Sequence, residues 1–324
     1  MSGVDQRRVA ADEDGLRLDR WFKRHFPQLS FGVVSKLMRT GQVRLDGKRV
    51  KPGDRVAAGQ TVRVPPLPDQ EEKAQPPHQA VPEAEAQRLR AAVLYKDAHV
   101  IVLNKPPGLA VQGGSGLSRH LDAMLDALTF EAPSRPKLVH RLDKDTSGLL
   151  VLGRTANAAA ALAKSFKART THKLYWALVK RVPSPAQGKI DLRLDKQPGR
   201  GGEKMMVARD GKPAVTLYSV QDKAAQRAAW LALKPVTGRT HQLRAHLAAI
   251  GHPIIGDGKY GGEDAFLGGV ISKKLHLHAR RLRLDHPAGG ILDVTAPLPE
   301  HMTASWETFG WDPSLTDDPF EELL

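Results

Sequence analysis

The chain contains no cysteine in its 324 residues. This absence excludes disulfide bonds, zinc sites with thiolate ligands, iron-sulfur clusters and a cysteine nucleophile. Histidine is the other common metal ligand, but the 13 histidines include no HExxH motif. His241 and His246 are five positions apart, so a helix would not bring both imidazoles to one face. We therefore predict that the protein binds no metal.

Long apolar runs are also missing. No segment approaches the roughly 18 consecutive apolar residues that a membrane-spanning helix needs. The first residues, MSGVDQRRVAADEDG, lack the apolar centre of a signal peptide, and their acidic side chains disfavour a transit peptide. We therefore expect a cytoplasmic protein without a membrane segment.

Positive charge, in contrast, is abundant. The chain has 49 lysines and arginines against 35 aspartates and glutamates, a formal net charge of +14 and a pI near 10.0. Such a surface attracts polyanions, and nucleic acid is the first candidate, although a basic surface that only aids solubility is the alternative. Half of the excess, +7, lies in residues 1–65, which hold 14 basic and 7 acidic side chains. This segment therefore predicts a binding arm.

The pattern of residues 1–65 predicts two short helices and a hairpin. Apolar side chains recur at helical spacing over 18–26 and 33–38, and the following strand enters an Asp46-Gly47 turn. The cations expected to face outward are Lys36, Arg39, Arg44, Lys48, Arg49 and Lys51. The stretch LDRWF…SFGVVSKLMRTGQVRLDGKRVKPGDRV resembles an S4 domain, a small α/β RNA-binding module whose cations would contact RNA phosphates. A solvated helical face without a ligand is the alternative.

The rest of the chain divides by composition. Residues 66–90 are rich in proline, glutamate, glutamine and alanine, which predicts a linker after the S4 domain. Residues 91–310 contain strand patterns interrupted by helical patterns, which predicts an α+β domain around an extended, mostly antiparallel sheet. The acidic residues 311–324 predict a loose tail or a short docking segment.

The segment HRLDKDTSGLL, residues 140–150, concentrates charge immediately before an apolar strand. Asp143 stands close to Arg141 and Lys144, and neighbouring cations favour the ionised form of a carboxyl group. An ionised carboxylate suits a nucleophile and does not suit a general acid. Alternatively, Asp143 or Asp145 caps a turn while its neighbours form a surface ion pair. Spacing alone does not decide between these interpretations.

Four other motifs accompany this segment. They are NKPPGLAVQGG from Asn104, HKLYWALV from His172, PVTGRTHQLRAH from Pro235 and GHPIIGDGKYGG from Gly251. Together with HRLDKDTSG they resemble the RluA family of pseudouridine synthases, in order and approximate spacing, over nearly all of residues 91–300. The TSG of the charged motif, the S4 arm and the closing APLPEHM segment are more similar to RluC than to RluD.

The resemblance implies the pseudouridine synthase fold for residues 91–310 and a specific reaction. Uracil is detached from ribose at N1, turned, and rejoined through C5. This isomerisation uses no cofactor, metal or redox partner. A uridine inside a helix must first be flipped out, at a cost of a few kcal/mol.

The resemblance also assigns roles by motif position. Asp143 corresponds to the nucleophile, and Arg141 to the residue that fills the stack vacated by the flipped nucleotide. Tyr175 corresponds to the tyrosine that lies against the base, and Arg244 to the arginine that pairs with the catalytic aspartate. A core position for Tyr175 and a phosphate contact for Arg244 are the alternatives. Strand periodicity places Trp176 on the face opposite Tyr175.

Three further residues are candidate RNA contacts. Arg239 and His241 lie at the start of the predicted HQLRAH helix, whose free amides suit a phosphate. Lys105 of the KPPG segment either contacts a phosphate or belongs to a strand end with a structural role. We also expect Tyr260, in GDGKYGG, to pack beside the site.

We therefore predict an enzyme that isomerises specific uridines in large-subunit ribosomal RNA, free or in an assembling particle, as a monomer without a guide RNA. A synthase for transfer RNA is one alternative, which the S4 arm disfavours. A non-catalytic ribosome-assembly factor is another, and the presence of Asp143, Tyr175 and Arg244 argues against it. A hydrolase using Asp143 and Asp145 lacks a partner acid elsewhere in the sequence.

Overall fold

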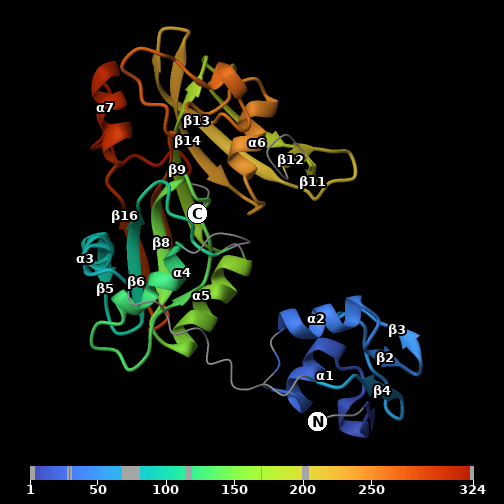
Figure 1. Ribbon diagram of the computed structural model, residues 1–324. Coiled ribbons are helices and arrows are strands. Elements are labelled where there is room, and N and C mark those ends of the chain that lie inside the picture. The colour runs from blue at the N-terminus through green and yellow to red at the C-terminus, as the bar shows by residue number, and fades with distance from the viewer. Residues whose placement is uncertain are drawn as a thin grey trace. The chain divides into compact units, whose positions relative to one another are not determined.

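The structure divides the chain near residue 77. The computed structural model describes residues 4–27, 29, 31–67, 81–113, 119–168, 170–198 and 204–321, in two units, Met1–Pro77 and His78–Leu324 (Figure 1). Residues 68–80, most of the predicted linker, lie outside the described residues. The end of the predicted linker is helical, since α3 (Glu83–Ala91) buries Ala86 and Leu89. The second unit therefore begins before residue 91.

The first unit combines two helices with a small antiparallel sheet of order β1-β4-β2-β3. Its elements are β1 (Asp5–Arg8), η1 (Ala11–Glu13), α1 (Leu18–His25), α2 (Phe31–Arg39), β2 (Arg44–Leu45), β3 (Lys48–Arg49) and β4 (Thr61–Val64). Trp21 and Met38 from the helices share one buried cluster with Val62 from the sheet. Asp46 and Gly47 both have positive φ, 48° and 77°, as the predicted two-residue turn requires.

The second unit is built on a ten-stranded sheet of order β10-β13-β14-β9-β15-β8-β6-β5, with β16 beside β15 and β7 beside β8. The strands are β5 (Val93–Lys96), β6 (Val100–Lys105), β7 (Lys137–Leu138), β8 (Ser147–Gly153), β9 (His172–Lys180), β10 (Gln187–Asp191), β13 (Val215–Ala224), β14 (Ala228–Pro235), β15 (Leu277–Asp285) and β16 (Ile291–Thr295). Among the described strand pairs of this sheet, only β8 with β15 is parallel. The predicted α+β fold with a mostly antiparallel sheet is confirmed.

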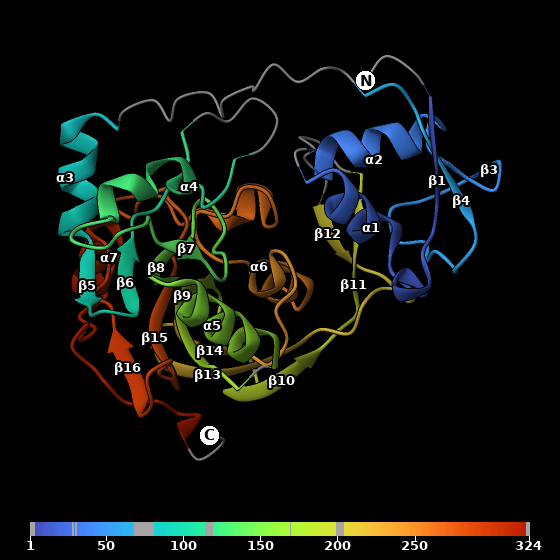
Figure 2. The same ribbon diagram turned by 90° about the horizontal axis from the view of Figure 1, so that it is seen from below.

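Helices cover both faces of this sheet. They are α3, α4 (Leu121–Met124), η2 (Leu125–Leu128), α5 (Ala156–Ala168), α6 (Gln242–Ala249), η3 (Gly262–Ala265) and α7 (Glu300–Phe309). Leu247 of α6 packs in the cluster that contains Ala177, whereas Trp306 of α7 packs with Trp176, because alternate residues of β9 point to opposite faces. Figure 2 shows the sheet curving around α5 and α6. Within the described ranges, no helix has the length and apolar content needed to cross a membrane.

Two smaller features complete the second unit. The strands β11 (Leu194–Gln197) and β12 (Lys204–Val207) pair in a separate two-stranded sheet. The described part of the predicted tail, residues 311–321, is docked, since Trp311 and Phe320 are buried in the cluster of Trp176. The carboxylate of Asp318 has no exposed surface and lies 2.5 Å from Nε2 of His172, the first residue of β9. These contacts pack the described tail residues against the rest of the second unit.

Candidate active site

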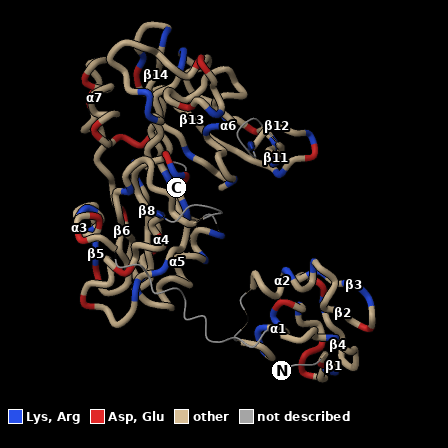
Figure 3. Tube along the Cα trace, in the orientation of Figure 1, with Lys and Arg blue, Asp and Glu red and all other residues tan. Residues whose placement is uncertain are grey.

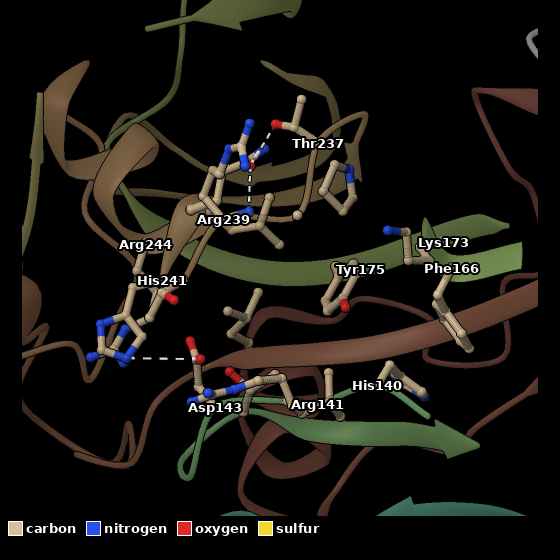
Figure 4. A pocket seen from close by; sticks show the side chains of 18 residues that line it. His140, Arg141, Asp143, Phe166, Lys173, Tyr175, Thr237, Arg239, His241 and Arg244 are labelled. Carbon is tan, nitrogen blue, oxygen red and sulfur yellow. Dashed lines mark hydrogen bonds and ion pairs between the residues drawn. The ribbon is translucent and has the colours of Figure 1, made fainter. Parts of the chain in front are cut away.

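A cavity of about 290 Å³ opens where three distant segments meet beside β9. The lining side chains come from the loop before β8, from β9, from the end of α5, and from the segment between β14 and α6 (Figure 4). Four of the predicted site residues that line it are Arg141, Asp143, Tyr175 and Arg244. Arg239 and His241 also line it. The fold thus brings together six of the seven residues that the sequence places in the catalytic domain's site.

The loop that carries Asp143 is extended and leads directly into β8. Leu142 is buried, whereas Arg141 is exposed and the Asp143 side chain retains 18% of its surface. Alternating exposure of this kind is typical of an extended segment, so Arg141 and Asp143 both face the cavity (Figure 4). Gly148 then enters β8 with φ +104°, and a Cβ there would lie 2.3 Å from the carbonyl oxygen of Ala279. Only glycine fits this parallel contact.

Lys105 does not line the cavity, which corrects its prediction as an RNA contact. Its side chain is only 1% exposed, at the end of β6. The ammonium donates to the carbonyl oxygens of Pro106, Leu109 and Lys144, at 2.9, 3.0 and 3.0 Å. Burial lowers the pKa of Lys105 to about 7, against the opposing field of Asp145 and Asp143. The lysine therefore ties the KPPG turn to the Asp143 loop from beneath.

Tyr175 faces the cavity across from Asp143 (Figure 4). It alternates along β9 with Trp176, which is buried on the other face among Trp230 and Trp306, as the strand period predicts. Burial, and then the negative charge of Asp143, raise the pKa of Tyr175 above its ordinary value. The phenol therefore keeps its proton at neutral pH and can donate a hydrogen bond in the cavity.

Arg244 pairs with Asp257 and not, as predicted, with Asp143. Its Nε and Nη2 donate to the two carboxylate oxygens of Asp257, at 2.7 and 2.8 Å. Both partners are buried, so this bidentate pair fixes the guanidinium. Burial alone would lower the pKa of Arg244, but Asp257 and the charge of Asp143 raise it. Arg244 thus supplies a fixed positive charge near Asp143. Its guanidinium is held by Asp257, which was not predicted from the sequence.

His241 is turned toward Asp143. Its Nε2 lies 3.8 Å from Oδ1 of Asp143, and its Nδ1 lies 2.9 Å from the hydroxyl of Tyr260. Burial lowers the pKa of His241, and the field of Asp143 opposes this shift. The predicted packing of Tyr260 beside the site is therefore present, and His241 is the side chain between it and the carboxylate.

Gln242 organises the segment that carries Arg239 and His241. Its amide oxygen accepts from the Thr237 hydroxyl at 2.6 Å and from the Arg239 backbone N–H at 3.0 Å. Its amide nitrogen donates to Val215 O on β13 at 2.9 Å. The Arg239 side chain donates from Nε to Pro213 O at 3.1 Å, so its guanidinium is partly engaged at the cavity mouth.

Three more cavity residues were not found from the sequence: His140, Phe166 and Lys173. His140 stacks on Phe166 of α5, with ring centroids 4.1 Å apart, and accepts from the Val151 N–H at 2.8 Å. Burial, and then the charge of Lys173, lower the pKa of His140 to about 3. The two-residue period of β9 from Tyr175 was the signal that could have revealed Lys173.

Cations of the first unit gather on α2 and on the β2-β3 hairpin (Figure 3). Lys36, Arg39, Lys48 and Arg49 are exposed, as predicted. Arg44 is only half-exposed, because its guanidinium donates to the carbonyl oxygens of Gly41 and Gly47, at 3.3 and 3.0 Å. Arg44 therefore holds the hairpin in addition to contributing charge.

The described part of the chain holds no group of three or more histidine, aspartate or glutamate side chains placed to bind a metal ion.

The chain is similar in sequence to known proteins and protein families. Residues 99–249 match the RNA pseudouridylate synthase family, and residues 16–62 match the S4 domain. The ribosomal large subunit pseudouridine synthases C of Salmonella typhi and of Escherichia coli K12 are each 36% identical to the chain, over 91% of it and 93% of their own length. The chain belongs to the RNA pseudouridylate synthase family. The resemblance predicted from the motifs is thereby confirmed.

Solved structures of other family members agree with this assignment. Human RNA Pseudouridylate Synthase Domain Containing 4 covers 70% of this synthase with a TM-score of 0.59 and 30% identity, over 96% of its own chain. Human RNA Pseudouridylate Synthase Domain Containing 1 covers 72% with a TM-score of 0.55 and 26% identity, over 92% of its own chain. The protein is therefore an isomerase that acts on RNA and carries an S4 RNA-binding domain.

Proposed function

We propose that this synthase converts specific uridines of large-subunit ribosomal RNA to pseudouridine, with Asp143 as the nucleophile. The cavity that joins Asp143, Arg141 and Tyr175 is the observation that carries the chemistry. The substrate class rests on the named relatives, which match along 91% of this chain, the S4 domain included. The synthase works as a cytoplasmic monomer on the RNA or its assembly particle, with residues 1–65 as the RNA-binding arm and the second unit, from α3 onward, as the catalytic domain.

The proposed reaction uses Arg141 first and Asp143 second. Arg141 enters the stack that the target uridine leaves, which offsets part of the flipping cost of a few kcal/mol. The Asp143 carboxylate then promotes cleavage of the bond between N1 and the ribose carbon. The uracil turns within the cavity and a bond forms from C5 to the same carbon. C5 loses its proton and N1 gains one, so the overall change is an isomerisation.

Tyr175 and the surrounding cations support these steps. The protonated phenol of Tyr175 lies on the side of the cavity opposite Asp143, where the flipped base would be held between them (Figure 4). The Arg244 guanidinium, fixed by Asp257, keeps a positive field close to the carboxylate. Arg239 at the cavity mouth and the exposed cations of α2 and β3 contact RNA phosphates.

Two other functions fit the chain less well. A transfer RNA substrate is not favoured, because the relatives aligned along this chain are named for the ribosomal large subunit. A purely RNA-binding role would not explain why the Asp143 carboxylate and the Tyr175 phenol face each other across one cavity.

The test is pseudouridine mapping across total RNA from cells that lack the gene, rescued by wild type, by Asp143→Asn or by Asp145→Asn. We expect sites in large-subunit RNA that vanish on deletion and return with wild type and with the exposed-neighbour control Asp145→Asn. Asp143→Asn should bind RNA as tightly as wild type and restore no site, because an amide is a poor nucleophile. Restoration by Asp143→Asn would refute the mechanism, and changes confined to transfer RNA would refute the substrate.

A further inference from the structure

A line of three polar contacts connects Asp143 to the hairpin β11-β12. The Met205 backbone N–H on β12 donates to the hydroxyl of Tyr260 at 3.1 Å. The same hydroxyl lies 2.9 Å from Nδ1 of His241. The other ring nitrogen of His241, Nε2, faces Oδ1 of Asp143 at 3.8 Å. The imidazole therefore stands between a phenol and the candidate nucleophile.

The carboxylate at one end of this line sets the order of the protons, because it accepts hydrogen bonds and donates none. A phenol carries one proton, and the Tyr260 oxygen already accepts the proton of the Met205 amide. Its own proton can be donated to Nδ1 of His241 when the imidazole proton faces the Asp143 carboxylate from Nε2. In a neutral imidazole one nitrogen accepts and the other carries the proton, so the His241 proton resides on Nε2. This N–H is directed at the Asp143 carboxylate.

The backbone of His241 is strained in a way that agrees with a fixed ring. His241 precedes α6 with φ 50° and ψ 23°, in the left-handed region that costs a non-glycine residue about 1 kcal/mol or more. Strained residues of this kind persist when their surroundings over-determine them, and they concentrate at functional sites. Here the hydroxyl of Tyr260 holds the ring from the side opposite Asp143.

Tyr260 is itself held from several directions. The guanidinium carbon of Arg244 lies 5.1 Å from the centre of its ring, and Nζ of Lys204 lies 5.0 Å from it. Its backbone N–H donates to Oδ1 of Asp257 at 3.2 Å. A tyrosine with these contacts has little freedom to rotate away, so its hydroxyl is a stable reference point for His241.

We propose that Tyr260 is a positioning residue that fixes His241 as the Nε2–H tautomer and aims this donor at the Asp143 carboxylate. The inference rests on the proposed role of Asp143. The separation of 3.8 Å is longer than a hydrogen bond, and such contacts in an enzyme without substrate commonly shorten in the complex. The donor engages one carboxylate oxygen and leaves the other free to react.

The tautomer is tested directly in the full-length protein without RNA. Long-range nitrogen-15 spectra of histidine-labelled protein distinguish a protonated ring nitrogen from an unprotonated one, and a His241→Gln sample assigns the signal. We expect wild type to show Nε2–H, and Tyr260→Phe to show a mixture of both tautomers. A proton on Nδ1 in wild type would overturn the proposal without any variant, and so would an unchanged Nε2–H tautomer in Tyr260→Phe.

Kinetics supply the second readout. In Tyr260→Phe we expect kcat to fall about tenfold with KM unchanged, the typical effect of losing one hydrogen bond that orients a reacting group. The ring and its cation contacts are retained in this variant. Tyr218→Phe is the matched control, because Tyr218 donates to Pro185 O and does not line the cavity. An unchanged kcat, or a change in KM alone, contradicts the positioning role. Activity retained by Asp143→Asn would instead refute the proposed function while leaving the tautomer result intact.

Discussion

Lys105 lies at the end of β6, beneath the loop that carries Asp143. From its motif, KPPG, either a phosphate contact or a structural role at a strand end was predicted. In the fold the ammonium is enclosed and serves three backbone carbonyl groups instead. Burial of a lysine depends on which strands cover it, and no local pattern encodes this. The consequence is that Lys105 acts on the shape of the Asp143 loop.

Lys105→Met is therefore expected to destabilise the catalytic domain. At pH 9, where the amine is largely neutral, the loss of its hydrogen bonds to buried carbonyl oxygens should lower the free energy of unfolding by about 2 kcal/mol. The loss should be smaller at pH 7, where wild type also bears the cost of burying the charge. The folded pKa is about 7 and the ordinary value is 10.5, so between these values the unfolded chain binds more protons and wild-type stability rises with pH. Urea unfolding at pH 7, 8 and 9 should show this rise, of about 1 kcal/mol per pH unit, in wild type alone. An equal slope in the variant would contradict the assignment.

The residues of the site differ in how far the sequence could specify them. Asp143, Arg141 and Tyr175 were placed by their motifs, and for Tyr175 strand alternation also separates its face from that of Trp176. The partner of Arg244 could not be placed in this way. Asp143 and Asp257 are both acids, and only the distances in the folded chain select Asp257. The orientation of His241 likewise depends on Tyr260, which approaches from a separate loop.

At the scale of elements, the pairing of β8 with β15, called the seam below, fixes the position of the Asp143 loop. This parallel pair joins Ser147 to His278 and Gly148 to Ala279, immediately after the Asp143 loop. Ser147 adds a side-chain contact, since its Oγ lies 2.9 Å from Nδ1 of His278. The loop therefore ends on a strand, β8, that is paired with β15. Because β15 also pairs with β9, the position of the loop is fixed relative to Tyr175 on β9.

Gly148→Ala should break this seam. The added Cβ would meet the backbone of Ala279, and φ +104° is unfavourable for alanine. We expect a loss of about 3 kcal/mol or more in the free energy of unfolding. Thermal unfolding measures the change, with Gly53→Ala as control, because a Cβ at Gly53 meets nothing within 4 Å. Wild-type stability in Gly148→Ala would show that β8 and β15 can separate without cost.

The sequence predicted most of the sheet and both S4 helices, since these elements have clear periods. It did not predict α3, α7 or the pair β11-β12. The α3 segment, EAEAQRLRA, buries only Ala86 and Leu89, so its apolar signal is weak and the preceding prolines favoured a linker. Whether residues 311–321 pack against the domain could not be predicted, because an acidic, proline-containing segment has no periodic apolar pattern that would indicate a buried face.

At the scale of the whole molecule, we propose that the first unit supplies RNA contacts additional to those of Arg239, and that the second unit supplies the chemistry. The exposed cations of α2 and β3 are independent of the cavity residues, so each set can be changed alone. A quadruple alanine variant should weaken RNA binding and flatten its salt dependence, because each lost phosphate contact lowers the slope of log affinity against log salt by about 0.7 to 0.9. The changed residues are Lys36, Arg39, Lys48 and Arg49.

Filter binding to a large-subunit RNA transcript between about 50 and 200 mM salt measures this slope. Asp143→Asn is the control and should keep the wild-type slope, whereas deletion of residues 1–65 should reduce it further. A quadruple variant with the wild-type slope would mean that RNA phosphates are contacted elsewhere.

The docked end of the chain has a practical meaning for anyone who handles this protein. Asp318 reaches the first residue of the strand that carries Tyr175, and Trp311 and Phe320 are enclosed beside it. An affinity tag or fusion partner attached after residue 324 would be anchored a few positions from these packed side chains. Purification handles are better placed at the other terminus, and a shortened version ending near residue 310 would lose part of the scaffold behind its own catalytic strand.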